Sequence, residues 1–221
     1  MKQKSQFILV EGTDGSGKAT QAKLLARALR RTGKKVVMVD FPQYGQPSAW
    51  LVEQYLNGRF GSAQKLGAYV PSLFYALDRF EASARIRMAL KAGKTVIANR
   101  YTLSNAAHQG GKISSPKERH KFWYWLFDLE YNLLHLPKPD VTIILHVPPK
   151  VSQQLVDKKS ARVYTHGKKR DLHEADLHHL KAAERAYLEL AKIYRFKLVE
   201  CINRGQLLSP SEIHAKVWEI I

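Results

Sequence analysis

The sequence is organised around residues 11–21, which run Glu11-Gly12-Thr13-Asp14-Gly15-Ser16-Gly17-Lys18-Ala19-Thr20-Gln21. An apolar run typical of a buried strand precedes them at 7–10, and helical apolar spacing follows at 21–29. Gly12, Gly17 and Lys18 match G-x-x-x-x-G-K, a loop that binds nucleotide phosphates when it connects a strand to a helix. Its glycines let backbone N–H groups converge, and the helix N-terminus and the lysine add positive charge. We therefore predict a phosphate-binding site made of Gly12, Thr13, Asp14, Gly15, Ser16, Gly17, Lys18, Ala19 and Thr20.

The position after Lys18 departs from the usual pattern. Phosphate-binding loops commonly carry a Ser or Thr there, whose hydroxyl ligates Mg²⁺, but this chain has Ala19 followed by Thr20. Either Thr20 compensates, or the ion is held mainly by water and substrate phosphates, as Mg²⁺ commonly is. The loop resembles the Gly-Lys-Gly-Thr version of adenylate kinases, so we interpret Ala19 as a variant rather than a sign of lost activity.

The composition fits one α/β domain spanning residues 1–221. Hydrophobic residues make up 45% of the chain, which excludes wholesale disorder. We find no apolar run long enough for a membrane span, and Met1 to Lys4 lead into a strand rather than a signal peptide. Cys201 is the only cysteine, so an intrachain disulfide is impossible. We therefore expect a cytoplasmic location and no membrane partner.

The net charge is strongly positive. Thirty-six basic residues against nineteen acidic ones leave +17, enough to attract nucleic acid non-specifically. The excess is spread along the chain, however, and no familiar nucleic-acid-binding motif accompanies it. A site that gathers two polyanionic nucleotides also benefits from positive potential, so nucleic acid is not the favoured partner.

Strand-like and helical patterns alternate along the chain. Further apolar runs lie at 36–39, 95–98, 141–145 and 196–200. The helical segments lie at 49–56, over 63–92 with an interruption at Pro71, at 122–136 before Pro137, after Pro148, at about 174–194, and after Ser209 as a cap. This alternation implies a parallel, five-stranded sheet in a three-layer α/β/α fold. Because ligands gather at the carboxyl ends of such strands, we expect the loop, residues 41–42 and residues 99–100 to meet.

Residues 158–170 differ in kind from the rest. They hold little apolar periodicity and many cations, namely Lys158, Lys159, Arg162, Lys168, Lys169 and Arg170. A solvated charge run is the usual explanation of such a segment. In a phosphoryl-transfer enzyme it is also what a mobile lid looks like, and we place such a lid at about 158–171.

Five stretches stand out when they are taken together. They are the loop from Gly12 to Lys18, Phe41-Pro42-Gln43-Tyr44-Gly45, Phe74-Tyr75-Ala76-Leu77-Asp78-Arg79, Asn99-Arg100-Tyr101, and Ser104-Asn105-Ala106-Ala107-His108-Gln109. With these stretches the chain resembles the thymidylate kinases, which are nucleoside monophosphate kinases of the P-loop type. Singly only the loop is specific, but in this order and spacing the five are jointly specific. The resemblance implies transfer of the γ-phosphate of Mg-ATP to thymidine 5′-monophosphate, and a homodimer.

The resemblance also implies roles for single residues. Arg100 matches the arginine that binds the acceptor phosphate, and Arg79 the one that reaches the pyrimidine. Tyr75 matches the aromatic residue that stacks on thymine, Asn105 the one that bonds its edge, and Asp14 an acid near the sugar and the metal. The implied substrate-binding set is Phe41, Pro42, Tyr44, Tyr75, Arg79, Arg100, Ser104, Asn105, His108 and Gln109. Without the neighbouring motifs, a simpler explanation would serve for two of these residues. Tyr75 could pack in the core like any aromatic residue of a helix, and Arg79 could form a surface ion pair with Asp78.

The catalytic set that we expect is Lys18, Arg100 and Asp14, with Arg162 and Arg170 as lid arginines. Phosphoryl transfer depends on positioning and charge neutralisation, so cations should converge on the γ-phosphate. Since Gly15 stands where an arginine could help, a basic lid is more necessary. For the metal, Mg²⁺, we expect no direct protein ligand beyond Thr20 and Asp14 acting through water.

Three further positions depart from the family pattern. Asn99 stands where Asp is usual, which removes a carboxylate near the metal. Gln43 replaces a usual Arg, which leaves the acceptor phosphate more dependent on Arg100, and His108 often corresponds to Tyr. The acceptor phosphate has a second pKa of about 6 and needs no general base, so a reduced rate or shifted acceptor preference is expected rather than inactivity.

Other functions compete with this one. A deoxynucleoside kinase on the same fold would need a carboxylate base, and only Asp40 lies close to the end of the second strand. A weakly active or non-catalytic nucleotide- or nucleic-acid-binding relative would explain Ala19, Asn99 and the charge. A zinc site is disfavoured, because His173-Glu174 and His178-His179 lack the His-Glu-x-x-His spacing.

Overall fold

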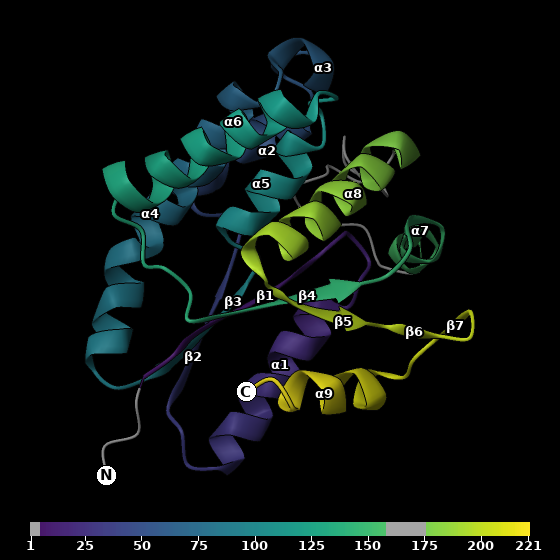
Figure 1. The fold of residues 1–221 in the computed structure, drawn as a ribbon. Helices are drawn as coiled ribbons and strands as arrows, with labels where there is room; N and C mark the ends of the chain where they lie inside the picture. Colours follow the sequence, from purple (N-terminus) through teal and green to yellow (C-terminus); the bar gives the residue numbers. More distant parts are fainter. Residues whose placement is uncertain (1–4, 158–175) are drawn as a thin grey trace.

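The computed structural model describes residues 5–157 and 176–221 (Figure 1). The lid expected at about 158–171, with Arg162 and Arg170, therefore lies outside the described residues, as does His173. Within the described part, no helix is both long and apolar enough to pass through a bilayer.

The main sheet has five strands, all parallel, in the order β2-β3-β1-β4-β5. The strands are β1 (Phe7–Gly12), β2 (Val36–Asp40), β3 (Thr95–Asn99), β4 (Val141–His146) and β5 (Lys197–Glu200). β1 is central and its side chains from Phe7 to Val10 are almost completely buried, as expected of a parallel strand covered on both faces. The predicted three-layer α/β/α fold is confirmed.

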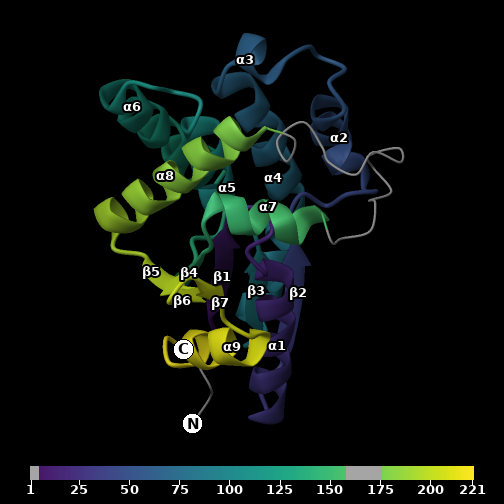
Figure 2. The same ribbon diagram turned by 90° about the vertical axis from the view of Figure 1, so that its right-hand side faces the viewer.

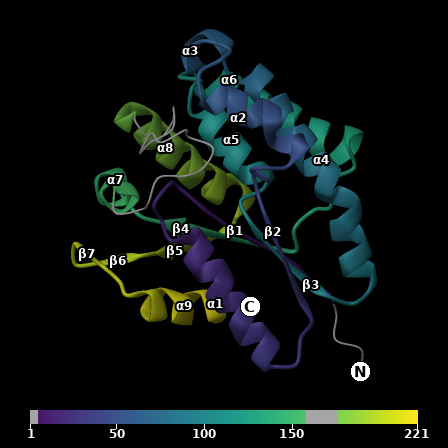
Figure 3. The same cartoon turned by 180° about the vertical axis from the view of Figure 1, so that it is seen from behind.

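Helices cover both faces of this sheet (Figures 1, 2 and 3). On one face α1 (Lys18–Arg31) packs against α9 (Pro210–Trp218), and Ile8 and Val10 meet Leu25 of α1 there. On the other face lie α4 (Tyr69–Lys91), α5 (Thr102–Gly110), α6 (Pro116–Phe127) and α8 (Leu177–Tyr194). Phe7 and Leu9 point to this second core, so alternate residues of β1 serve opposite layers.

The interruption expected at Pro71 is wrong. The helical segment breaks at Gly67, which has φ of 68°, between a short α3 (Ala63–Leu66) and α4. Pro71 is the third residue of α4, where its missing N–H has no intrahelical partner to lose. Before this segment, η1 (Pro47–Ala49) and α2 (Trp50–Leu56) form the predicted short helical stretch.

The helix expected over 122–136 is present in part: helical structure begins earlier, at Pro116, changes its geometry midway and ends at Leu133. α6 ends at Phe127 and is followed by a π-helical turn, η2 (Asp128–Leu133). This wider turn carries Glu130, which has no exposed surface. Such turns are rare and often occur at functional sites, and Glu130 bears on the site described below.

The C-terminal region adds a hairpin that the sequence analysis did not predict. β6 (Ile202–Asn203) and β7 (Gln206–Leu207) pair antiparallel around Arg204 and Gly205, which both have positive φ. The expected helix after Pro148 is α7 (Pro149–Asp157). Ser209 caps α9 as predicted, in a reciprocal capping box with Glu212.

The end of β1 allows a direct test of the fold. Gly12 has φ of 138°, and a Cβ there would lie 2.4 Å from the backbone oxygen of Leu145 on β4. We expect Gly12→Ala to lower the free energy of unfolding by more than about 3 kcal/mol, because paired strands cannot separate locally. Gly33→Ala is the matched control: its φ is 83° but nothing lies within 4 Å, so a cost of about 1 kcal/mol is expected. Urea denaturation measures both, and equal losses would contradict the strand contact.

Candidate active site

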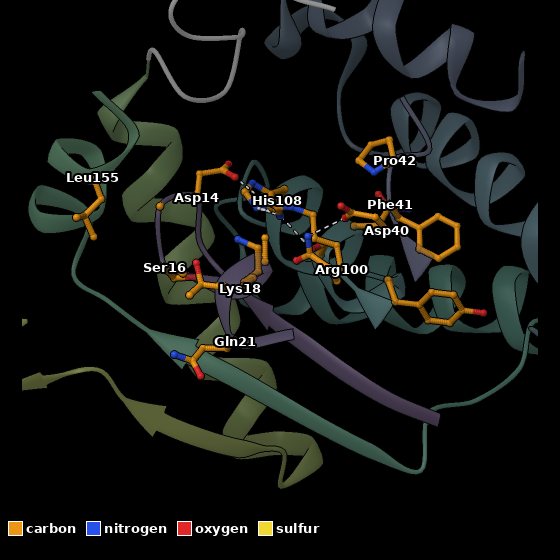
Figure 4. A pocket seen from close by; sticks show the side chains of 18 of the residues that line it. Asp14, Ser16, Lys18, Gln21, Asp40, Phe41, Pro42, Arg100, His108 and Leu155 are labelled. Atoms are coloured by element: carbon orange, nitrogen blue, oxygen red, sulfur yellow. Dashed lines mark hydrogen bonds and ion pairs between the residues drawn. The ribbon is translucent and has the colours of Figure 1, made fainter. Parts of the chain in front are cut away.

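A cavity of about 590 Å³ opens at the carboxyl ends of β1, β2 and β3 (Figure 4). It is lined by loop residues Asp14 to Thr20 and by every residue of the expected substrate-binding set, namely Phe41, Pro42, Tyr44, Tyr75, Arg79, Arg100, Ser104, Asn105, His108 and Gln109. Gly12 and Thr13 are buried and do not line it. The expected meeting of three strand ends is thus observed, because Phe41, Asn99 and Arg100 line the same cavity as the loop.

The loop wraps around the amino end of α1. Gly15 and Gly17 have φ of 81° and 85°, and Gly17 is the residue that precedes the first helical turn. The side chain of Lys18 returns over the loop, where its Nζ donates a 2.7 Å hydrogen bond to the carbonyl oxygen of Thr13. The first turn of α1 has no acidic residue, so its positive end is not neutralised from within the helix. This is the geometry of an anion site.

Glu11 connects β1 to two helices of the opposite layer. Its fully buried carboxylate accepts hydrogen bonds from the backbone N–H groups of Tyr101 and Ser104, at 2.8 and 3.0 Å. It also accepts bonds from the hydroxyls of Ser104, at 2.5 Å, and Tyr187 of α8, at 2.9 Å. The sequence analysis gave Glu11 no role. The only signal was an acid at the end of an otherwise apolar strand.

Arg100 is held in an unusual backbone conformation. Its φ is 67°, in the left-handed region, which non-glycine residues seldom occupy without constraint from their surroundings. Its guanidinium pairs with Asp14 and donates to Ser104 Oγ at 3.1 Å. Burial opposes the charge, but the Asp14 carboxylate together with further neighbours, Glu11 among them, outweighs burial and holds the pKa of Arg100 above its ordinary value. Arg100 therefore lies in the cavity as a fixed cation near Lys18 (Figure 4).

His108 forms a pair with His179 of α8. The His108 Nε2 lies 3.3 Å from Arg100, its Nδ1 lies 3.2 Å from His179 Nε2, and the two rings stack with centroids 5.4 Å apart. Burial lowers the pKa of both, that of His179 to about 4, so both are neutral at pH 7. Arg100 can only donate, so His108 must accept at Nε2 and carry its proton on Nδ1. His179, weighed above only as a zinc ligand, is thus a neighbour of the site.

Arg79 makes a buried ion pair, but with Glu130. Its Nε and a terminal nitrogen donate to the Glu130 carboxylate at 2.8 and 2.5 Å, with 2% and 0% of the two side chains exposed. The alternative of a surface pair with Asp78 is wrong. Thr102 donates to the same carboxylate at 2.5 Å, and Asn105 Nδ2 lies 3.3 Å from it. Sequence reasoning missed Glu130, because nothing near it in the chain marks it.

Two further placements bear on substrate binding. Asn105 lines the cavity, but its Oδ1 atom is buried and accepts no hydrogen bond within the described part of the chain. Gln43 does not line the cavity. Its backbone N–H and its amide donate to Asp78 at 2.9 to 3.2 Å, and its Oε1 accepts from Arg85 at 3.0 Å.

The residues present fit Mg²⁺ held chiefly by phosphates. Among residues 5–157 and 176–221, no cluster of three or more His, Cys, Asp or Glu side chains could bind a metal ion by itself. Carboxylates of Asp14 and Asp40 and the hydroxyl of Thr20 nevertheless line the cavity. One or two carboxylates with nucleotide phosphates and water are the usual environment of Mg²⁺.

Comparison with known proteins identifies relatives. A family model described as thymidylate kinase matches residues 10–204. The thymidylate kinase of Mycobacterium tuberculosis (strain H37Rv) is 31% identical over 186 residues, or 84% of this chain and 85% of the relative. The probable thymidylate kinase of Pyrococcus abyssi is 28% identical over 218 residues, which cover 97% of this chain and 95% of the relative. The solved thymidylate kinase of Candida albicans has the same fold, with a TM-score of 0.73, 23% identity, and coverage of 99% and 91% of the two chains.

The buried pair of Arg79 and Glu130 yields a stability prediction. Glu130→Ala leaves a buried guanidinium without its counter-ion, and we expect a loss of about 3–5 kcal/mol of unfolding free energy. Glu130→Gln, which keeps part of the hydrogen bonding, should cost less. Glu118→Ala removes an exposed partner of Lys121 and is the control, with no resolvable change expected. If guanidinium chloride denaturation gave similar values for Glu130→Ala and Glu118→Ala, the pair would not stabilise the fold.

Proposed function

The chain belongs to the thymidylate kinase family, and on this basis we propose that it transfers the γ-phosphate of ATP to thymidine 5′-monophosphate. The observation that supports this most is the convergence of Lys18 and Arg100 on one cavity. Each cation follows the end of a different strand, so two anionic groups can face each other between them. Tyr75 and Asn105 line the same cavity and supply the ring and the polar edge that a base requires.

The transfer needs no general base from the protein. An oxygen of the largely ionised acceptor phosphate attacks the γ-phosphorus, while the bond to the β–γ bridging oxygen breaks and ADP leaves with the electron pair. Lys18 and the loop N–H groups neutralise the donor phosphates. Arg100 binds the acceptor phosphate, in competition with its present partner Asp14. Arg162 and Arg170 are our candidates for the lid arginines.

The thymine ring finds complementary groups near α4 and α5. The half-buried Tyr75 packs edge-on against Tyr55, with centroids 6.4 Å apart and planes at 88°, which fixes the orientation of its ring. The Oδ1 of Asn105 has no donor within the described part of the chain, and a small rotation of the side chain would bring it to the N3–H of thymine; in the present arrangement the amide nitrogen donates to Ser72 and Glu130. Arg79 keeps its two bonds to Glu130 in this arrangement and forms part of the cavity wall.

Magnesium is the metal that we propose. Asp14 and Thr20, which line the cavity, would hold the water shell of the ion, and the bound ion would neutralise charge on the nucleotide phosphates. A cytoplasmic location agrees with the lone cysteine, Cys201, which is buried and whose pKa burial raises to about 12.

A homodimer through α4 agrees with the surface of that helix. Val70, Leu73, Leu77 and Phe80 follow one another at intervals of three or four residues, and each is 40–49% exposed. Ala82 and Ile86 of the same helix are buried in the core. An exposed apolar stripe of this length on a surface helix suits burial against an identical helix across a two-fold axis.

An acceptor screen tests the proposed reaction. With ATP and Mg²⁺, we expect thymidine 5′-monophosphate to be the best acceptor among the nucleoside monophosphates, and thymidine to be inert. Arg100→Gln should lower kcat/KM for the acceptor by about 100- to 1000-fold, because it removes the fixed cation opposite the acceptor phosphate. Arg27→Gln, a charge-matched change at an exposed position of α1 outside the cavity, should leave kcat/KM unchanged. Preferential phosphorylation of thymidine, or ATP binding without turnover, would overturn the proposal.

The stripe on α4 predicts the oligomeric state. We expect the double variant Leu77→Glu with Phe80→Glu to be monomeric in light scattering at concentrations where the unmodified chain is dimeric. Ile193→Glu, at a 47% exposed position on α8, is the matched control and should not change the mass. A monomeric unmodified chain, or dissociation by both changes, would refute the α4 interface.

A further inference from the structure

The ends of β2 and β3 carry a polar pair that the proposed function has not used. Asp40 and Asn99 are register partners on these neighbouring strands, and the Asn99 Nδ2 donates a 2.7 Å hydrogen bond to Asp40 Oδ1. Both residues line the cavity. Asn99 is partly buried whereas Asp40 is exposed toward the cavity, so the amide orients a carboxylate that can be reached.

The pair explains the unusual residue at position 99. The family resemblance leads one to expect Asp there, but a second carboxylate in hydrogen-bond contact with Asp40 would leave two like charges side by side. An amide at position 99 removes that conflict and donates to the acid. The site therefore keeps one carboxylate at these two strand ends. It lies on β2 instead of β3, which is a shift of one strand spacing, about 4.8 Å.

We propose that Asp40, oriented by Asn99, takes over the role of the carboxylate missing from β3 and binds the water shell of the nucleotide-bound Mg²⁺. This inference rests on the proposed function, because it assigns a residue to the metal of that same reaction. A contact through water tolerates a shift of one strand spacing better than a direct metal bond does, since Mg²⁺ keeps several waters and few protein ligands.

The electrostatic surroundings of Asp40 agree with this role. Burial raises the pKa of the Asp40 carboxyl above its ordinary value, although Arg100, the amide of Asn99 and Lys18 oppose that rise. The acid thus lies within electrostatic reach of the two cations assigned to the donor and acceptor phosphates (Figure 4). Because it is exposed toward the cavity, its charge acts at the place where the two phosphates would meet.

The test exchanges the two side chains. Asp40→Asn, Asn99→Asp and the double exchange Asp40→Asn with Asn99→Asp are compared by Mn²⁺ electron paramagnetic resonance titration of the enzyme with ADP. We expect Asp40→Asn to weaken Mn²⁺ binding about 10- to 100-fold, and the Mg²⁺ concentration for half-maximal turnover to rise in parallel. The double exchange restores one carboxylate beside one amide and should recover most of the affinity. Glu118→Gln, a charge-matched change at an exposed position outside the cavity, should have no effect.

The outcomes separate this inference from the proposed function. If Asp40→Asn leaves Mn²⁺ affinity unchanged, or if Asn99→Asp alone tightens it with Asp40 still present, the role of Asp40 is refuted. Since the Mn²⁺ titration uses ADP and requires no turnover, it remains informative even if thymidine 5′-monophosphate proves not to be the acceptor. Thermal unfolding of each variant shows whether a loss reflects the site or the fold.

Discussion

The site depends above all on the buried carboxylate of Glu11. It lies at the end of the central strand, and a carboxylate there is tolerable only if its oxygens are hydrogen-bonded. The donors come from the start of α5 and from Tyr187 of α8. For the N–H groups of Tyr101 and Ser104 to reach Glu11, the chain must turn sharply after β3. The left-handed φ of Arg100 is that turn, so the acid behind the phosphate loop determines where the acceptor-side cation lies.

A second buried acid fixes α5 from another direction. Glu130 accepts from Thr102, approaches Asn105 and binds Arg79 of α4. Between Glu11 and Glu130, the first turns of α5 are held on two sides, and Ser104, Asn105 and His108 enter the cavity from a backbone that cannot easily move. A site whose side chains are fixed in this way loses less conformational freedom when substrate binds. Arg79 is thus held in place by Glu130, a partner that could not be found from the sequence motif in which Arg79 lies.

The sequence specified those features that local patterns encode. The phosphate loop, the five strands and the meeting of three strand ends each follow from a few consecutive residues, and the structure confirms them. The partners of the site could not be found this way. Glu130, His179 and Tyr187 are 51, 71 and 176 residues from Arg79, His108 and Glu11, and only the packing of β1, α4, α5, η2 and α8 brings them together. Two helix boundaries were predicted wrongly. Composition does not show that Pro71 falls in the first turn of a helix, where proline is tolerated, and it does not show that the helix expected over 122–136 widens to a π-helical turn after Phe127.

Two arginines of the cavity are paired with carboxylates, and this pairing bears on the acceptor. Among the described residues Arg79 is neutralised by Glu130 and Arg100 by Asp14, while burial and Arg100 keep His108 uncharged. A ligand that draws Arg100 away must offset the loss of a carboxylate partner, which a phosphate dianion can do and a neutral hydroxyl cannot. A nucleoside would leave the pair of Arg100 and Asp14 intact. The arrangement therefore favours a monophosphate acceptor, because the buried guanidinium of Arg100 needs an anionic partner, and a phosphate can replace Asp14 in that role.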